Sequence, residues 1–186
     1  MEDISLHILD IAENSVSASA TFIRISIADE PDKDLFIVTI EDNGKGMDAV
    51  FVRNVLDPFC TTRTVRNIGL GLPFLAQAAR ETGGDIHIQS VVGQGTIVRA
   101  DFRPSHIDMK PLGNITDTIV TLIAGNPRTD FLFSYERSGK SYILDTREIR
   151  AALGDVPMNA ADVLSAIRND LAEGLRSVKE IRNVPL

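Results

Sequence analysis

Two polar side chains near the beginning of the chain have the types and the spacing that phosphate chemistry requires. Asp10 and Asn14 lie in residues 4–17, where apolar residues recur at helical spacing, and His7 and Ser17 fall on the same polar side. Residues four positions apart project from one face of a helix, so this carboxylate and this carboxamide point in the same direction. Together they can hold a magnesium-bound phosphate and orient a water molecule. The alternative is that both belong to the solvated side of the helix.

A second polar segment, residues 42–47, follows directly after an apolar stretch that alternates like a strand. Asp42 opens this segment, and its carboxylate can accept a hydrogen bond from an exocyclic amine. Gly44 and Gly46 have no side chains, which lets the backbone approach a flat ring closely. The alternative is a tight turn, because Asn43-Gly44 is a strong turn signal.

A third segment, Gly69-Leu70-Gly71-Leu72, opens a stretch with helical periodicity. Glycines at the beginning of a helix expose backbone N–H groups at the positive end of the helix dipole, where phosphate oxygens bind well. The spacing is not that of a dinucleotide-binding fold. It is not that of a P-loop either, because a P-loop ends in Gly-Lys-Ser or Gly-Lys-Thr.

A fourth segment, Gly93-Gln94-Gly95-Thr96, separates two alternating stretches and predicts a hairpin turn. The Thr96 hydroxyl can reach a ligand from this position. Taken alone, the segment is simply a turn, so its meaning depends on the three segments that precede it.

The elements that must position these segments follow from hydrophobic periodicity and from turn residues. An irregular stretch is expected at residues 57–68, and Arg103-Pro104-Ser105 marks the expected boundary between residues 1–104 and a second region, 107–186. The expected elements are helices at 4–17, 48–56, 70–82, 114–124, 146–153 and 159–180, and strands at 21–28, 34–41, 85–91, 96–102, 130–135 and 140–145. In the last helix, four apolar residues form a stripe that indicates either core or a face for another chain: Val163, Ile167, Leu171 and Leu175.

Taken in order, the four segments resemble the N, G1, G2 and G3 boxes of the GHKL ATPases, the superfamily of DNA gyrase B, heat-shock chaperones, histidine kinases and MutL. Residues 13–21 are similar to MutL. The run from Asp57-Pro58-Phe59 through Thr61-Thr62-Arg63 to residues 69–72 is closer to histidine kinases. The resemblance covers about residues 4–102 and leaves the rest of the chain unexplained.

The resemblance implies a binding site for ATP and a magnesium ion, with a role for each matching residue. Asn14 would ligate Mg2+, Asp42 would read the adenine amino group, and Thr96 would contact adenine through a water molecule. Residues 57–68 would form a lid, in which Arg63 would either pair with a phosphate or be solvated. The other nucleotide-binding positions would be Gly44 and Gly46 at the base, Gly69 and Gly71 at the phosphates, and Met47, Thr62, Leu70 and Leu72.

Asp10 departs from the resemblance. Family members that hydrolyse ATP usually have Glu four residues before the magnesium-binding Asn, where it serves as general base, and histidine kinases more often have Asn. The aspartate keeps the carboxylate and shortens its reach by one methylene, so hydrolysis that depends on Asp10 is expected to be slow. The three histidines, His7, His87 and His106, lack the context of a phospho-accepting histidine.

Composition and charge indicate an ordinary globular protein. Its 186 residues suit one domain with an extension or two small domains, and 44% of them are hydrophobic. The net charge of −7 argues against a nucleic-acid-binding surface, and no apolar run approaches the ~20 residues of a membrane span. The single cysteine, Cys60, excludes an internal disulfide and is typical of a reducing compartment, so a cytoplasmic location is expected.

The expected fold is a two-layer α/β (α+β) sandwich of the Bergerat ATP-binding type, in which helices cover one face of a mixed sheet and hold the nucleotide. A small C-terminal α/β appendage, residues 107–186, is expected to serve a protein partner or a homodimer. Three functions agree with the resemblance: a slow ATPase switch, a serine protein kinase similar to anti-sigma factors, and a non-catalytic sensor of ATP against ADP. The preferred interpretation is a regulator that binds Mg-ATP and hydrolyses it or transfers its phosphate.

Overall fold

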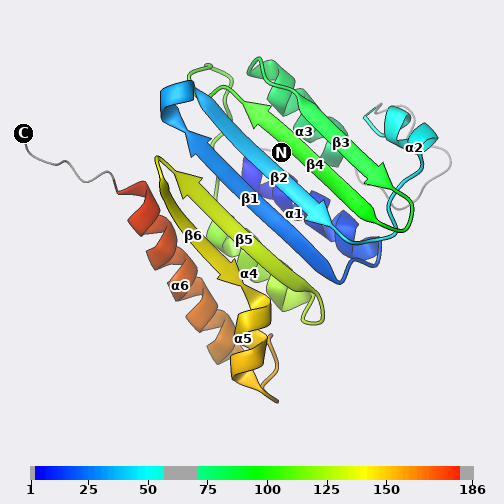
Figure 1. Ribbon diagram of the computed structural model, residues 1–186. Coiled ribbons are helices and arrows are strands. Elements are labelled where there is room, and N and C mark those ends of the chain that lie inside the picture. The colour runs from blue at the N-terminus through cyan, green and yellow to red at the C-terminus, as the bar shows by residue number, and fades with distance from the viewer. Residues whose placement is uncertain (1–2, 57–70, 181–186) are drawn as a thin grey trace, which may run out of the picture.

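The computed structural model describes residues 3–56 and 71–180, which build one six-stranded sheet in the order β3-β4-β2-β1-β5-β6 (Figure 1). The strands are β1 (Phe22–Glu30), β2 (Leu35–Asp42), β3 (Ile86–Val91), β4 (Gly95–Phe102), β5 (Asp130–Arg137) and β6 (Lys140–Asp145). Neighbouring strands are antiparallel except β1 and β5, which run parallel. The expected mixed sheet is therefore confirmed.

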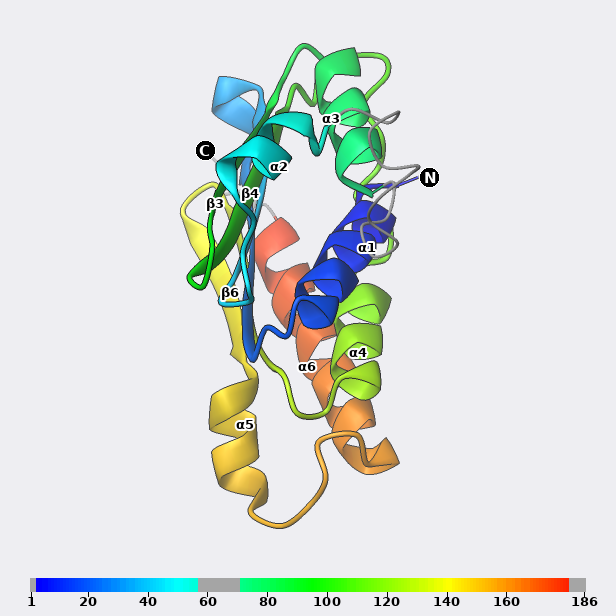
Figure 2. The same cartoon turned by 90° about the vertical axis from the view of Figure 1, so that its right-hand side faces the viewer.

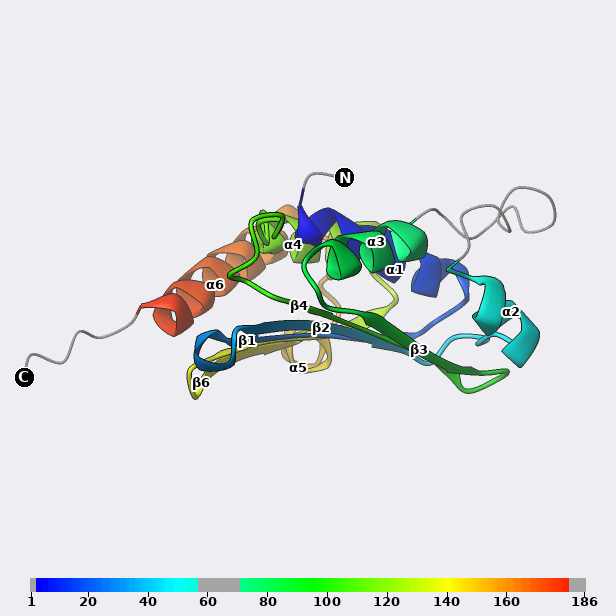
Figure 3. The ribbon, with the colours of Figure 1, turned by 90° about the horizontal axis from the view of Figure 1, so that it is seen from above.

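Four helices lie over one face of this sheet (Figures 2 and 3). They are α1 (Ile4–Ser17), α3 (Gly71–Glu81), α4 (Ile115–Gly125) and α6 (Ala161–Lys179), while α2 (Ala49–Asn54) lies near β3 and α5 (Thr146–Leu153) continues from the end of β6. Within this layer α1 contacts α3 on one side and α4 on the other. The two-layer sandwich is confirmed, and none of the helices in the described ranges has the length and hydropathy of a membrane span.

Alternation along the strands places the core between the sheet and the helix layer. Ile23 and Ile25 of β1 are fully buried and pair with Phe131 and Phe133 of β5, which are equally buried. The helices add aliphatic side chains to the same core, among them Ile4 and Ile8 from α1, Ile119 and Leu122 from α4, and Ile167, Leu171 and Leu175 from α6. The apolar stripe of the last helix is therefore core, with Val163 packed at its margin.

The C-terminal region is α/β as expected, and its strands extend the sheet of the first region instead of forming a sheet of their own. β5 pairs with β1 from Phe22 opposite Asp130 to Asp29 opposite Arg137. Without this pairing β1 would present an open edge of unpaired backbone groups. The division of the chain into residues 1–104 and 107–186 stays a prediction. Within the described residues both regions contribute to one sheet and one core.

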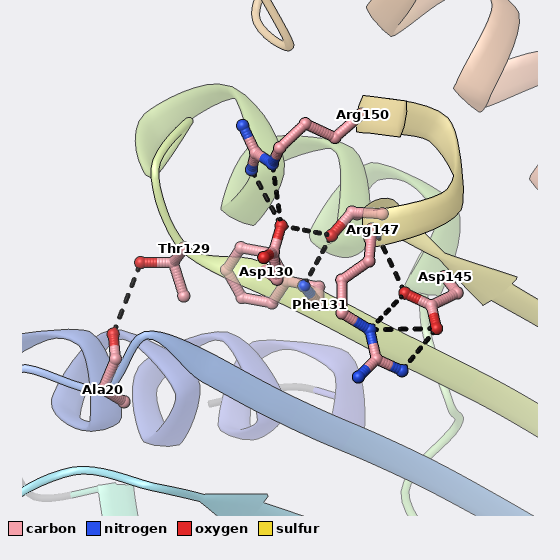
Figure 4. Close-up of polar contacts among 8 residues, drawn as sticks. Ala20, Thr129, Asp130, Phe131, Asp145, Arg147 and Arg150 are labelled. Atoms are coloured by element: carbon pink, nitrogen blue, oxygen red, sulfur yellow. Dashed lines mark hydrogen bonds and ion pairs between the residues drawn. The ribbon is translucent and has the colours of Figure 1, made fainter. Parts of the chain in front are cut away.

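Polar contacts at the beginning of β5 tie the C-terminal region to the turn between α1 and β1 (Figure 4). The Asp130 backbone N–H donates to the Thr21 carbonyl at 2.9 Å, and the Thr129 hydroxyl donates to the Ala20 carbonyl at 3.5 Å. Arg150 of α5 forms an ion pair with the Asp130 carboxylate at 2.8 Å. These contacts fix the chain just after the C-terminal end of α1, the helix that carries two of the predicted site residues.

The opposite end of α1 is held by the connection between β4 and α4. The first N–H groups of a helix have no partner within it, and here Ile4 and Ser5 donate to the carbonyls of Pro111 and Leu112 at 3.0 and 2.8 Å. The Asp3 carboxylate caps the same turn by accepting from a backbone N–H. Both ends of α1 are therefore fixed by residues that lie beyond position 104.

Candidate functional site

A pocket opens between α1, the end of β2 and the beginning of β4. It is lined by Ile11, Asn14, Ser15, Ser17 and Ala18 from α1 and its C-cap, by Asp42, Lys45, Gly46 and Met47 after β2, by Leu72 of α3, and by Thr96 and Val98 of β4. Each of the four segments singled out in the sequence thus contributes at least one residue to the same pocket: Asn14, then Asp42 with Gly46 and Met47, then Leu72, and finally Thr96.

The Asp42 carboxylate is oriented by hydrogen bonds to both of its oxygens. Oδ1 accepts from the Gly44 backbone N–H at 2.8 Å, and Oδ2 accepts from the Ser15 hydroxyl at 2.7 Å. Ser15 is only 5% exposed, so the donor of this bond is buried while the Asp42 carboxylate is partly exposed. Because a carboxylate oxygen has two lone pairs, each oxygen retains one acceptor position. Asp42 therefore presents acceptors of fixed direction at the wall of the pocket.

The segment after β2 bridges α1 and the β3–β4 hairpin. The Lys45 N–H donates to the Ala18 carbonyl at 2.9 Å, and the Lys45 carbonyl accepts from the Gly93 N–H at 2.8 Å. Gly46 has a φ of +64°, and a Cβ at this position would lie 2.1 Å from the Val91 carbonyl oxygen. Only glycine meets both conditions. The segment is thus a tight turn and a wall of the pocket at the same time.

Asp10 lies against the first residue of α3. A Cβ on Gly71 would lie 1.9 Å from Asp10 Oδ2 and 2.8 Å from its carboxyl carbon, so the carboxylate occupies the space that a side chain would need. A negative group is favoured at the positive end of a helix dipole, and the same place suits a phosphate oxygen. The structure therefore brings Asp10 to the region that the third segment was predicted to offer to phosphates.

Thr96 and Asp42 are cross-strand neighbours, because Thr96 of β4 pairs directly with Asp42 of β2. Directly paired residues of an antiparallel pair project from the same face of the sheet. The Thr96 hydroxyl lies 2.8 Å from the Ser90 hydroxyl of β3. Two polar side chains of the pocket thus stand next to each other, and each has a serine beside it.

Part of the predicted site lies outside the ranges 3–56 and 71–180. The undescribed range, residues 57–70, contains the predicted lid (57–68) and Cys60 within it. It also contains four predicted site residues: Thr62, Arg63, Gly69 and Leu70. Their predicted roles stay predictions.

Sequence reasoning missed Ser15 and assigned His7 to the wrong environment. Ser15 continues the helical spacing of the buried residues Ile4, Ile8 and Ile11, and this spacing is the signal that could have found it. His7 was predicted on the polar side of α1, but it is 2% exposed, because α3 covers this part of α1. Burial lowers the pKa of His7, while the nearby carboxylates of Asp10 and Asp3 act in the opposite direction.

Comparison with known proteins identifies the family and the extent of the match. The family of histidine kinase-, DNA gyrase B-, and HSP90-like ATPases matches residues 2–106. A putative sensor protein of Shewanella frigidimarina is 33% identical over 97 residues, which cover 51% of this chain and 15% of that protein. The sensor kinase CckA of Brucella abortus is 33% identical over 93 residues, which cover 50% of this chain and 10% of that protein. This chain therefore spans only a small part of the length of these relatives.

A solved structure shares the fold beyond the family match. The N-terminal domain of a DNA repair protein superposes with a TM-score of 0.51 and 14% sequence identity, covering 85% of this chain and 59% of that one. At this identity the likeness concerns the fold alone. The family match covers more than half of the chain and includes all four segments of the pocket. The protein therefore belongs to the family of histidine kinase-, DNA gyrase B-, and HSP90-like ATPases.

Proposed function

We propose that this protein binds Mg-ATP in the pocket between α1, the end of β2 and the beginning of β4, and that it releases phosphate slowly as a regulatory switch. The observation that carries the proposal is the Asp42 carboxylate, held by Ser15 and Gly44 with acceptor positions left for a ligand. Those positions suit the exocyclic amine of adenine. Apolar neighbours in the lining, such as Met47 and Val98, suit a flat ring.

Asn14 provides a protein ligand for a magnesium ion that binds together with the nucleotide. Mg2+ is commonly bound by one or two protein oxygens together with substrate phosphates and water. Asn14 lines the pocket and offers one amide oxygen of this kind. When bound, the ion would neutralise phosphate charge, and Asn14 would hold it on the side of the pocket nearest to α1.

We assign the role of general base to Asp10. Its carboxylate lies beside the beginning of α3, where backbone N–H groups and the helix dipole favour phosphate oxygens. From this position it would accept a proton from the water that attacks the terminal phosphate. Its side chain is one methylene shorter than the usual glutamate, which supports a slow reaction.

The proposal of a switch rests on how α1 is held. Its N-terminal end bonds to the connection before α4, its flank contacts α4, and the turn after it bonds to the beginning of β5. A change in the position of α1 on nucleotide binding would therefore reach the C-terminal region. A regulated protein partner, or a second copy of the chain, would sense the nucleotide there.

The test is phosphate release from Mg-ATP by the purified chain, with ATP binding measured in parallel. Asp10→Asn should abolish release and retain binding, whereas Asp162→Asn, on the exposed surface of α6, should change neither. Release that persists in Asp10→Asn would contradict the assignment of the base. Binding without release by the wild type would contradict the ATPase and direct the search to a kinase substrate or to a sensor.

A further inference from the structure

We propose that a separate pocket, between α1, α3 and the connection from β4 to α4, binds a free α-amino acid with an apolar side chain. This α1–α3 pocket has a volume of about 270 Å³ and is lined by six residues: His7, Phe74, Gln77, Ala78, Glu81 and Lys110. The nucleotide pocket is lined by a different set of described residues. The inference therefore goes beyond the proposed function and does not depend on it.

The His7 imidazole is a buried polar group in the wall of the α1–α3 pocket. His7 is 2% exposed, and no described residue forms a hydrogen bond with its Nδ1 atom. Buried polar groups of proteins nearly always have a hydrogen-bond partner, and a group without one destabilises the fold. Because burial lowers the pKa of His7, the ring is uncharged near neutral pH and has one donor and one acceptor nitrogen. A polar ligand in the pocket would provide a partner for this ring.

Two opposite charges line the same pocket from different segments. Glu81 is the last residue of α3, and Lys110 belongs to the connection before α4. Within the described ranges, neither of them forms an ion pair. The Gln77 amide donates a hydrogen bond to Glu81 Oε1 at 2.8 Å and thereby orients the carboxylate. The second carboxylate oxygen of Glu81 and the Lys110 ammonium therefore remain for a ligand.

An α-amino acid has charges that match this pair. Its carboxylate would bind the Lys110 ammonium and its ammonium group would bind the Glu81 carboxylate, both through charge-assisted hydrogen bonds. The Phe74 ring and the Ala78 methyl group form the apolar part of the lining, which suits an apolar side chain. The volume lies just below the range of pockets that hold drug-sized ligands, so the ligand must be small. A single amino acid meets all of these conditions.

The ligand would bind where three segments meet. His7 lies three residues before Asp10 on α1, and α3 begins beside the Asp10 carboxylate. Lys110 directly precedes Pro111 and Leu112, whose carbonyls accept hydrogen bonds from the first N–H groups of α1. A bound amino acid would therefore stabilise the packing of α1 against α3 and against the connection before α4.

The test is titration calorimetry of L-valine, L-leucine and L-phenylalanine into the full chain. Each amino acid is compared with the two analogues that keep only one of its charges, which for valine are isovalerate and isobutylamine. We expect at least one of the three to bind, and each of its analogues to bind about tenfold more weakly or worse, because one charge-assisted hydrogen bond is lost. Absence of binding by all three, or an analogue that binds as tightly as its amino acid, would overturn the proposal.

Two variants outside the core test the charged groups. Lys110→Met removes the ammonium group and Glu81→Gln removes the negative charge, and each should lower the affinity for the amino acid about tenfold. Lys33→Met and Glu173→Gln, at exposed positions outside the α1–α3 pocket, are the matched controls and should bind like the wild type. Wild-type affinity in Lys110→Met or in Glu81→Gln would overturn the proposal, because the amino acid would then bind elsewhere.

His7→Phe tests the imidazole. The substitution keeps a ring and removes both nitrogens, so the affinity for the amino acid should also fall about tenfold. Circular dichroism without ligand shows whether the variant is folded, and if it is not, Lys110→Met and Glu81→Gln decide the question. Wild-type affinity for the amino acid in folded His7→Phe would overturn the proposal.

Discussion

The Ser15 hydroxyl donates a 2.7 Å hydrogen bond to Asp42 Oδ2 and thereby joins α1 to the end of β2. Ser15 Oγ also lies 3.2 Å from the Ile11 carbonyl of the preceding helical turn. The serine thus sits between the helix backbone and the carboxylate. It sets the direction in which Asp42 presents its remaining lone pairs to the pocket.

We expect Ser15→Ala to weaken ATP binding about tenfold, because one oxygen of a partly buried carboxylate loses its donor and the group is less well oriented. Alanine favours a helix, so the midpoint of thermal unfolding should change little. Titration calorimetry and thermal unfolding measure the two effects. Ser165→Ala, on the exposed surface of α6, is the matched control. Equal ATP affinity in Ser15→Ala and the wild type would show that Asp42 needs no support from α1.

Gly71→Ala tests the approach of Asp10 to α3. The added methyl group would lie 1.9 Å from Asp10 Oδ2, so the carboxylate must move away from its position. Phosphate release should fall about 100-fold, as expected of a displaced catalytic group, with a smaller change in ATP affinity. Gly125→Ala is the control, because a Cβ there meets nothing within 4 Å. Normal release by Gly71→Ala would mean that the position of Asp10 does not matter for the reaction.

The buried His7 predicts how stability depends on pH. Burial lowers its pKa below the ordinary value of 6.5, so the unfolded chain takes up this proton first as the pH falls. Between the pKa of His7 in the unfolded chain and its lower pKa in the folded chain, the unfolded state binds more protons. In this pH range the stability of the fold therefore decreases as the pH falls. Urea unfolding between pH 5 and pH 8 measures this slope. His7→Phe should flatten this dependence of stability on pH. A wild-type slope that persists in His7→Phe would assign the effect to other groups.

A chain ending at residue 106 should not fold stably. It would lack β5, which covers the edge of β1, and α4, which packs on α1. In the full chain, Phe133→Ala is a milder form of the same change and should cost about 3–5 kcal/mol of unfolding free energy, since Phe133 is fully buried. Circular dichroism and urea unfolding of the chain ending at residue 106 and of Phe133→Ala check the two predictions. Cooperative unfolding of residues 1–106 with normal ATP affinity would instead support the domain boundary predicted at Arg103-Pro104-Ser105.

Local features of the fold and site could be predicted from the sequence. The apolar spacing of residues 4–17 and the alternation before Asp42 are local signals, and helix α1 and strand β2 lie where they indicate. The resemblance carried by the four segments implied that Asn14, Asp42 and Thr96 share one site, and all three line the same pocket.

Features that depend on tertiary packing could not be predicted in this way. Strand periodicity does not indicate which strands pair with each other, so the pairing of β5 with β1 could not be predicted from the sequence. The burial of His7 depends on α3 lying across α1, and the role of Ser15 depends on which side of α1 faces β2. In each case the missing information concerns contacts between residues distant in the chain.

The central claim, that Asp42 reads a nucleotide base in this pocket, is tested most directly by calorimetric titration of Mg-ATP into the wild type and Asp42→Asn. The amide replaces an acceptor by a donor and removes the charge, so the account predicts a measurable affinity for the wild type and a loss of at least about 100-fold in Asp42→Asn, with an unchanged unfolding transition. Asp162→Asn should bind like the wild type. Tight ATP binding by folded Asp42→Asn would contradict the account.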